Sequence, residues 1–365
     1  MTCQVKTPGK LILIGEYAVL EGAPAMVLAV NRYARINITQ PQGIDFTVQS
    51  PTLGIAKIPF QITSQRKLSF PPEIPSAQIK LLSFFTDILE YFLQHEKNIS
   101  GLPAYEISLN TQEFYLTGKK QKLGLGSSAA LTVGLVQGIL YLLNRDDIRV
   151  IDPHHLFSVA EQIHFQAQGG KGSGIDIASS CFGGLILFQR LTDRDQYSFK
   201  TEAIEFPDDL KILPVWTGIS ASTPEKVRQV QKLREKNRQT YNSILINLTE
   251  ISQKACVALM NQDTSQFIIY CKEYDRALKE LSEASKADII SPVHETISRI
   301  VSAEGAVYKP SGAGGGDIGL AFTQSSEIAQ HVSDKLLRSG FEILNLGPSF
   351  QGSMIESKDI SKRGE

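Results

Sequence analysis

Hydrophobic and polar positions along this chain predict a mixture of strands and helices. Short runs of β-branched and apolar residues are typical of strands, whereas apolar positions three and four apart are typical of helices. Strands are predicted at residues 34–40, 106–110, 211–218, 305–310 and 318–323. Helices are predicted at residues 79–94, 127–144, 153–168, 223–259 and 265–281. The N-terminal run 10–30 is broken by Gly15, Gly22 and Pro24, so short strands joined by tight turns are expected there.

The length of the chain favours two domains. A chain of 365 residues is longer than a single hydrophobic core usually supports, and two domains imply a cleft between them. Residues 191–207 are polar and charged, which makes this segment the candidate boundary. We therefore predict an N-terminal domain at residues 1–200 and a C-terminal domain at residues 201–365.

Composition and charge make several classes of protein improbable. Hydrophobic residues make up 42% and charged residues 21% of the chain, which is typical of a folded globular protein. The formal net charge is −1, so no global positive field attracts nucleic acid or an anionic membrane, and neither is expected as a partner. The sequence shows no signal-peptide pattern and no apolar run long enough to span a bilayer, which predicts a cytoplasmic protein.

A glycine- and serine-rich segment, KLGLGSSAAL, leads into the predicted helix 127–144. Glycines let backbone N–H groups face a ligand, and a helix N-terminus carries partial positive charge, so this pattern suits a phosphate group. The segment lacks the G-K-[ST] of a Walker motif, so any lysine that neutralises phosphate charge must come from elsewhere in the chain. A purely structural glycine turn is the alternative.

The same segment also fits a dinucleotide-binding fingerprint, through Gly124, Gly126 and Ala129. That fingerprint requires a buried strand immediately before it, yet the preceding residues are TGKKQK. A nicotinamide site is therefore a weak alternative.

Two further glycine-rich segments follow. Residues 170–176, GKGSGID, place Asp176 at the predicted start of a helix, where it could cap the helix or orient an acceptor oxygen for phosphoryl transfer. Residues 309–319, KPSGAGGGDIG, contain four glycines within five residues, more than a hairpin turn needs. Close approach of the backbone to a ligand explains them better.

Three segments together resemble the motifs of the GHMP kinases. They are PGKLILIGEYAVLEG at residues 8–22, GLGSSAA at residues 124–130 and KPSGAGGGD at residues 309–317. The resemblance spans residues 8–322 and implies an α+β, two-domain fold. The N-terminal, nucleotide-binding domain is expected to be like domain 2 of ribosomal protein S5, and the C-terminal domain to be ferredoxin-like.

Within this family, the details are most similar to phosphomevalonate kinases. Residues 15–19 read G-E-Y-A-V, whereas mevalonate kinases have G-E-H-A-V, and residues 216–223 are similar to the W-T segment of the first group. Ile318 departs from the pattern, since many members have cysteine there. The resemblance implies ATP- and Mg²⁺-dependent phosphoryl transfer to (R)-5-phosphomevalonate, giving 5-diphosphomevalonate and ADP in the mevalonate route to isoprenoids. Mevalonate kinase is the main alternative.

The resemblance also implies roles for individual residues. Lys10 is expected to stabilise charge on the transferring phosphoryl group, and Asp176 to orient or deprotonate the acceptor phosphate. The residues expected at the ATP phosphates are Lys122, Gly124, Leu125, Gly126, Ser127, Ser128 and Ala129. Those expected at the acceptor are Lys10, Tyr17, Lys122, Ser173, Asp176, Ser222, Thr223, Ser311, Gly312 and Ala313. Magnesium is expected at Ser128 and Glu161, and the protein is expected to be a monomer or homodimer.

For some of these residues a structural role is an open alternative. Ser128, Ser173, Ser222 and Thr223 are residue types that commonly cap helices or turns. Lys122 follows other lysines and could be a solvated surface residue.

Overall fold

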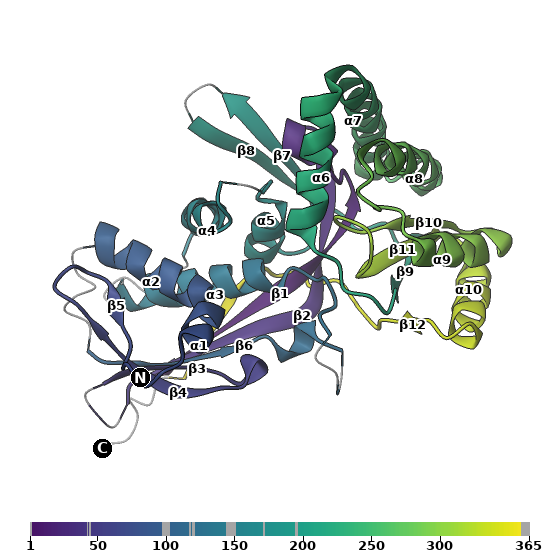
Figure 1. Cartoon of the computed structure of the whole chain (residues 1–365). Helices are drawn as coiled ribbons and strands as arrows, with labels where there is room; N and C mark the ends of the chain where they lie inside the picture. Colours follow the sequence, from purple (N-terminus) through teal and green to yellow (C-terminus); the bar gives the residue numbers. More distant parts are fainter. Residues whose placement is uncertain are drawn as a thin grey trace.

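The computed structural model describes residues 2–41, 43, 45–96, 103–116, 118, 121–143, 151–170, 172–193 and 196–358. These residues form two β-sheets that are each accompanied by helices (Figure 1). Strand β1 of the first sheet lies against the glycine-rich segment 309–317 of the second, because the Ser311 hydroxyl bonds both the N–H and the C=O of Ile12.

The larger sheet has nine described strands in the order β13-β1-β2-β6-β3-β4-β5, with β7 pairing with β2 and with β8. The strands are β1 (Thr2–Ile14), β2 (Ala25–Thr39), β3 (Phe46–Ser50), β4 (Ile55–Ile62), β5 (Leu68–Ser69), β6 (Glu106–Asn110), β7 (Leu185–Asp193), β8 (Gln196–Ile204) and β13 (Met354–Lys358). Long antiparallel pairing of β1 with β2 forms its centre, and a register shift between Pro8 and Gly9 interrupts this pairing just before Lys10.

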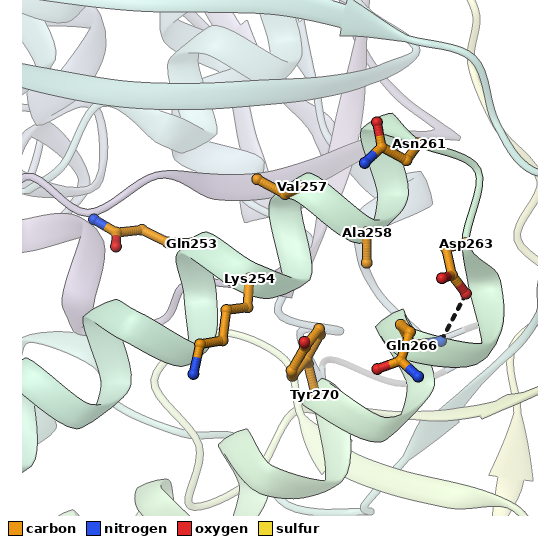
Figure 2. Close-up of a pocket in the computed structure, with 8 residues that line it drawn as sticks. All are labelled: Gln253, Lys254, Val257, Ala258, Asn261, Asp263, Gln266 and Tyr270. Atoms are coloured by element: carbon orange, nitrogen blue, oxygen red, sulfur yellow. Dashed lines mark hydrogen bonds between the residues drawn. The ribbon is translucent and has the colours of Figure 1, made fainter.

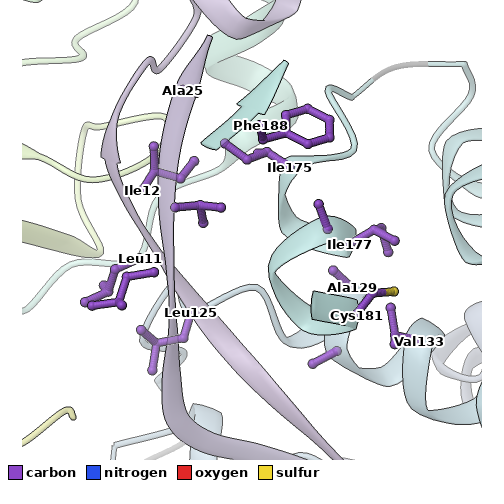
Figure 3. Packing of buried hydrophobic residues seen from close by; sticks show 14 of the residues in the cluster. Leu11, Ile12, Ala25, Leu125, Ala129, Val133, Ile175, Ile177, Cys181 and Phe188 are labelled. Atoms are coloured by element: carbon purple, nitrogen blue, oxygen red, sulfur yellow. The ribbon is translucent and has the colours of Figure 1, made fainter. Parts of the chain in front are cut away.

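Helices of the first part of the chain cover this sheet. They are α1 (Ser76–Leu81), α2 (Ser83–His95), α3 (Ser127–Leu143), α4 (Pro153–Ala167) and α5 (Ile175–Phe182), with short 3-10 turns η1 (Ala18–Glu21), η2 (Pro51–Leu53) and η4 (Gln112–Phe114). Helix α3 is buried on most of its faces and packs directly on β1 and β2. Figure 3 shows Ala129 and Val133 of α3 with Ile177 and Cys181 of α5 in this core.

The smaller sheet has the order β10-β11-β9-β12, and each of its pairs is antiparallel. Its strands are β9 (Lys211–Trp216), β10 (Val307–Pro310), β11 (Ile318–Thr323) and β12 (Glu342–Ile343). The accompanying helices are α6 (Thr223–Lys236), α7 (Arg238–Met260), α8 (Thr264–Ser285), α9 (Pro292–Ala303) and α10 (Ser326–Arg338). Helices α9 and α10 cover this sheet, while α7 also contacts β1, β2 and η1 of the first part (Figure 1).

Most of the predicted elements are present, with three differences. The helix expected at residues 79–94 is divided at Leu82 into the end of α1 and α2. The N-terminal run forms two long strands joined by η1 rather than several short ones. The single helix expected at residues 223–259 is two helices, because the Asn237 side chain accepts the N–H of Thr240 and starts α7 afresh.

The expected domain division at residue 200 falls inside β8, which pairs with β7 as far as Ile204. Strand β13, from the far end of the chain, also joins the larger sheet by pairing with β1. The larger sheet thus takes strands from both sides of the expected division, and the division itself stays a prediction. No helix among the described residues combines the length and the apolar character needed to cross a membrane.

Glycines in α3 allow the helix to lie close to the sheet. A Cβ at Gly134 would lie 2.4 Å from Ile36 Cδ1 and 2.8 Å from Thr7 Oγ1. These distances are shorter than van der Waals contact, so the helix and the sheet could not keep their present spacing with a larger residue there.

We predict that Gly134→Ala destabilises the protein by about 1–3 kcal/mol, because overpacking outweighs the better helix propensity of alanine. Urea denaturation measures the change. Gly138→Ala is the graded control, since its Cβ would meet only the flexible end of Ile38 below 3.4 Å and a smaller loss is expected. A gain in stability for Gly134→Ala would contradict the packing argument.

Candidate active site

Lys10 lies on β1 at the point where the strand meets the loop before α3. Its side chain is buried, with 6% of the residue exposed. Its backbone N–H donates to the C=O of Leu125 at 2.9 Å, which ties the strand to that loop. Gly9 permits this contact, because a Cβ there would lie 2.9 Å from the same carbonyl oxygen.

The side chains of Asp176 and Lys10 lie next to each other, beside Gly126. The Lys10 Nζ and Asp176 Oδ1 atoms are 3.7 Å apart. A Cβ at Gly126 would lie 3.2 Å from Lys10 Cγ and 3.8 Å from Asp176 Oδ2, so the glycine lies directly beside the pair. Asp176 does not cap its helix: Gly174 is the N-cap residue of α5 and Asp176 lies in the first turn. The capping alternative for Asp176 is therefore wrong.

The third glycine-rich segment approaches the same point. A Cβ at Gly312 would lie 3.7 Å from Lys10 Nζ. A Cβ at Gly124 would lie 2.5 Å from Asp317 Cβ, which places the end of this segment against the loop before α3. The structure thus brings together Lys10, Asp176 from the segment 170–176, and backbone from the loop before α3 and from the segment 309–317.

The loop before α3 presents mainly backbone. Leu125 and Ala129 are buried at 1% exposure, so their side chains belong to the core. Ser127 and Ser128 are half-buried in the first turn of α3. Lys122 is exposed and makes an isolated β-bridge with Tyr115.

His164 on α4 lies next to Ser128, which the sequence did not indicate. Its Nε2 is 3.5 Å from Ser128 Oγ and 3.1 Å from Gln168 Nε2, and Phe84 stacks on its ring. Burial lowers the pKa of His164, although the charge of Asp176 opposes this shift. The imidazole is therefore neutral near pH 7.

Asp317 is a second carboxylate near Lys10, and it was not among the expected site residues. It occupies the left-handed region with φ of 54°, and its Oδ1 accepts the N–H of Ala221 at 3.2 Å. Burial raises its pKa, while that hydrogen bond and the charges of Lys10 and Lys122 oppose the rise. Asp317 thus connects the segment before α6 to the glycine loop before α3.

Other expected site residues lie around this centre. Ser222 is the N-cap position of α6, next to Ala221, and its side chain makes no capping hydrogen bond; Thr223 follows it as the first residue of α6. Ser173 Oγ accepts the N–H of Ile175 in a local turn. Glu161 on α4 lies beside Gly174, because a Cβ at Gly174 would be 3.6 Å from Glu161 Oε1. Burial raises the pKa of Glu161, while the charge of Arg190 opposes this rise.

Tyr17, Ser311 and Ala313 lie at the contact between the two sheets. The Tyr17 hydroxyl donates to the C=O of Ala313 at 2.6 Å, and the Ser311 hydroxyl donates to the C=O of Ile12 at 2.9 Å. Both side chains are buried. Their hydroxyl protons are therefore used within the protein.

A buried ion pair lies behind these contacts. Lys309 Nζ and Glu16 Oε1 are 2.5 Å apart, and the two side chains are 0% and 2% exposed. Lys309 also donates to the C=O of Pro310 at 2.7 Å, and Glu16 accepts the N–H of Gly312 at 3.4 Å. The pair fixes the start of the glycine-rich segment to the end of β1. The sequence signal was present, because both residues lie within the quoted motifs.

A pocket elsewhere on the molecule does not involve these residues. It lies between α7 and α8 and has a volume of about 360 Å³ (Figure 2). The side chains that line it are Gln253, Lys254, Val257, Ala258, Asn261, Asp263, Gln266 and Tyr270. None of the expected site residues is among them. Within the described ranges, no group of three or more His, Cys, Asp or Glu side chains could hold a metal ion.

Comparison with known proteins identifies the fold. Residues 85–184 match the GHMP kinases N terminal domain. A Lin0012 protein from Listeria innocua has a TM-score of 0.85 at 25% identity, covering 98% of this chain and 100% of that one. The Streptococcus pneumoniae phosphomevalonate kinase in complex with phosphomevalonate and AMPPNP has a TM-score of 0.75 at 22% identity, covering 95% and 99%. This chain has the GHMP kinase fold.

Curated relatives carry two enzyme names. Phosphomevalonate kinase of Saccharolobus solfataricus is 28% identical over 86% of this chain and 88% of its own length. Phosphomevalonate kinase of a Streptomyces species is 25% identical over 94% and 96%. Mevalonate kinase of Candida albicans is 26% identical over 93% and 86%. The resemblance to GHMP kinases recognised from the three motifs and the expected α+β fold are confirmed.

We predict that breaking the buried ion pair is strongly destabilising. Glu16→Leu or Lys309→Met alone should lower the free energy of unfolding by about 3–5 kcal/mol, because each leaves an unpaired buried charge. The double variant should lose much less than the sum, since it removes both charges. Urea denaturation of all three variants gives the coupling energy.

The control for this cycle is the exposed pair Lys279 and Glu295, whose side chains are 54% and 50% exposed. Lys279→Met should cost no more than about 1 kcal/mol. Equal losses for Lys309→Met and Lys279→Met would show that the buried pair does not hold the two sheets together.

Proposed function

We propose that this protein transfers the terminal phosphoryl group of ATP to (R)-5-phosphomevalonate, giving 5-diphosphomevalonate and ADP. The observation that carries the proposal is the Lys10 and Asp176 pair, set beside Gly126 at the start of a buried helix. Relatives named phosphomevalonate kinase that match 86% and 94% of this chain support the choice of acceptor.

The loop before α3 is proposed to hold the nucleotide phosphates. Backbone N–H groups from Gly124 to Ala129 stand at the N-terminus of a 17-residue helix, where partial positive charge favours anions. Positive φ at Gly124 and Gly126, 74° and 78°, allows the loop its tight path. Lys122 adds a cation beside it.

Lys10 and Asp176 are proposed to act on the reacting groups. The Lys10 ammonium neutralises charge on the transferring phosphoryl group, and Asp176 orients or deprotonates the acceptor. A phosphate acceptor is already largely ionised near neutral pH, because its second pKa is about 6. Positioning and charge neutralisation therefore matter more here than strong basicity.

Ser128 and Glu161 are the proposed magnesium ligands. A hydroxyl and a carboxylate are oxygen donors, which Mg²⁺ prefers, and this ion commonly takes only one or two protein ligands together with substrate phosphates. When bound, Mg²⁺ would neutralise charge on the nucleotide phosphates. Ser173, Ser222, Thr223 and the α6 N-terminus are proposed to contact the phosphate of the acceptor, together with Lys122.

Mevalonate kinase is the second candidate, because the Candida albicans relative with that name matches 93% of this chain. A nicotinamide oxidoreductase is not supported. Among the described strands, β6 is the last before Gly124, and it ends at Asn110, so no buried strand runs directly into the loop as the dinucleotide fingerprint requires.

We predict that purified protein with ATP and Mg²⁺ releases ADP with phosphomevalonate at a kcat/KM at least about 100-fold above that with mevalonate, since a site built for a phosphate leaves polar groups unpaired without it. A coupled ADP-release assay with phosphomevalonate, mevalonate and galactose measures the ratio. A preference for mevalonate would contradict phosphomevalonate as the acceptor but would leave the proposed kinase activity standing. Absence of turnover with every acceptor would overturn both.

We predict that Lys10→Met lowers kcat more than Asp176→Asn does. Loss of the lysine should cost about 10²–10³-fold, as for other groups that stabilise transition-state charge, whereas an ionised acceptor needs less help from Asp176. Lys200→Met and Glu202→Gln, which change an exposed pair on β8, serve as controls and should leave kcat unchanged. Equal or reversed losses would contradict this division of roles.

A further inference from the structure

The corner between β1 and η1 has an unusual backbone. Tyr17 has φ of 62° and ψ of −48°, and the N–H of Ala18 donates to the C=O of Glu16 at 2.7 Å. This i to i+2 hydrogen bond around a residue with positive φ is that of a rare, strained γ-turn. A bulky residue keeps such a conformation only when its surroundings determine it.

The surroundings of Tyr17 come from the other sheet. Its ring is buried at 5% exposure, and its hydroxyl donates to the C=O of Ala313 at 2.6 Å. Burial and the charge of Glu16 raise the pKa of the Tyr17 hydroxyl, so it remains a donor at any physiological pH. The Tyr274 hydroxyl on α8 donates to the C=O of Glu16 at 2.6 Å, which is a further contact to the same corner.

The corner therefore holds three residues of the segment 309–313. Glu16 binds Lys309 and the N–H of Gly312, while Tyr17 binds the carbonyl of Ala313. Gly312 also lies against the Lys10 ammonium, because a Cβ there would be 3.7 Å from Lys10 Nζ. The position of this segment thus determines which backbone the Lys10 side chain contacts.

We propose that Tyr17 is a positioning residue for phosphoryl transfer: its hydroxyl, aimed by the strained turn, holds residues 311–313 against Lys10 and so fixes where the ammonium stands. This differs from the expectation that Tyr17 contacts the acceptor, which stays a prediction; the Tyr17 hydroxyl proton is used on Ala313. The inference rests on the proposed function, since Lys10 is the group that it positions.

The test variant is Tyr17→Phe, which removes one hydroxyl and keeps the ring. Tyr241→Phe is the matched control. Tyr241 is also buried, and its hydroxyl donates to Glu21 Oε1 at 2.8 Å between α7 and η1. It joins the same two parts of the protein without touching the glycine-rich segment, so a merely structural effect should be similar in both variants.

Two readouts separate positioning from stability. Hydrogen exchange followed by mass spectrometry reports on peptides covering residues 311–317, where the N–H groups of Ser311, Gly315 and Asp317 are hydrogen-bonded. Exchange there should be at least about fivefold faster in Tyr17→Phe and unchanged in Tyr241→Phe. Steady-state kinetics should show kcat about tenfold lower in Tyr17→Phe, with KM for ATP and phosphomevalonate within about twofold.

Other outcomes overturn the proposal. Unchanged exchange at residues 311–317 would show that the hydroxyl does not hold the segment. A raised KM for phosphomevalonate with kcat retained would mean that Tyr17 contacts the acceptor after all. Failure of the proposed function is seen separately, as absence of turnover in the wild-type protein. In that case the exchange measurement alone decides whether the Tyr17 hydroxyl holds residues 311–313 in place.

Discussion

The contact between Glu16 and Lys309 is the interaction on which the placement of the segment 309–317 beside Lys10 depends. An ion pair with both side chains out of water is costly unless each charge is satisfied. Here Lys309 bonds Glu16 and the carbonyl of Pro310, and Glu16 Oε1 also accepts the N–H of Gly312, while Glu16 Oε2 is buried without a hydrogen-bond partner among the described residues. These bonds form only when the end of β1 and the start of the glycine-rich segment lie together. The pair therefore favours one relative placement of the two sheets, the one that brings Gly312 to Lys10.

Missing side chains shape the surroundings of Lys10 at two positions. Gly9 lets β1 contact the loop before α3 and Gly126 leaves room for the Lys10 side chain, whereas a Cβ at Gly312 would make only ordinary contact with the ammonium at 3.7 Å. Any Cβ at the first of these positions would meet a carbonyl oxygen at 2.9 Å. Backbone of the loop before α3 and of the segment 309–317 thus lies close to Lys10, and backbone groups of fixed direction suit a site that must bind phosphates without reorganising.

The sequence predicted the parts of this site that depend on local pattern. The apolar helix after Gly126, the helix start at Asp176 and the glycine-rich turn all have local signals, and the motif resemblance indicated that they belong together. It did not predict the γ-turn at Tyr17, because no residue preference favours a bulky side chain there. Nor did it place His164 beside Ser128 or Asp317 against Gly124, since these contacts depend on how distant segments pack. The sequence predicts Asn237 inside a helix, because the apolar spacing continues through it.

The two lysine and carboxylate pairs of the interface differ in a way that suits different tasks. Glu16 Oε1 and Lys309 Nζ are 2.5 Å apart and both side chains are buried, so neither charge is available to a ligand. Lys10 and Asp176 are 3.7 Å apart, and the Asp176 side chain is 36% exposed. In a partly exposed pair the lysine can exchange its carboxylate partner for another anion at small cost. The contact that it gives up is weaker than the contact in a buried pair. The buried pair holds the backbone in place, and the partly exposed pair is free to act on a bound anion.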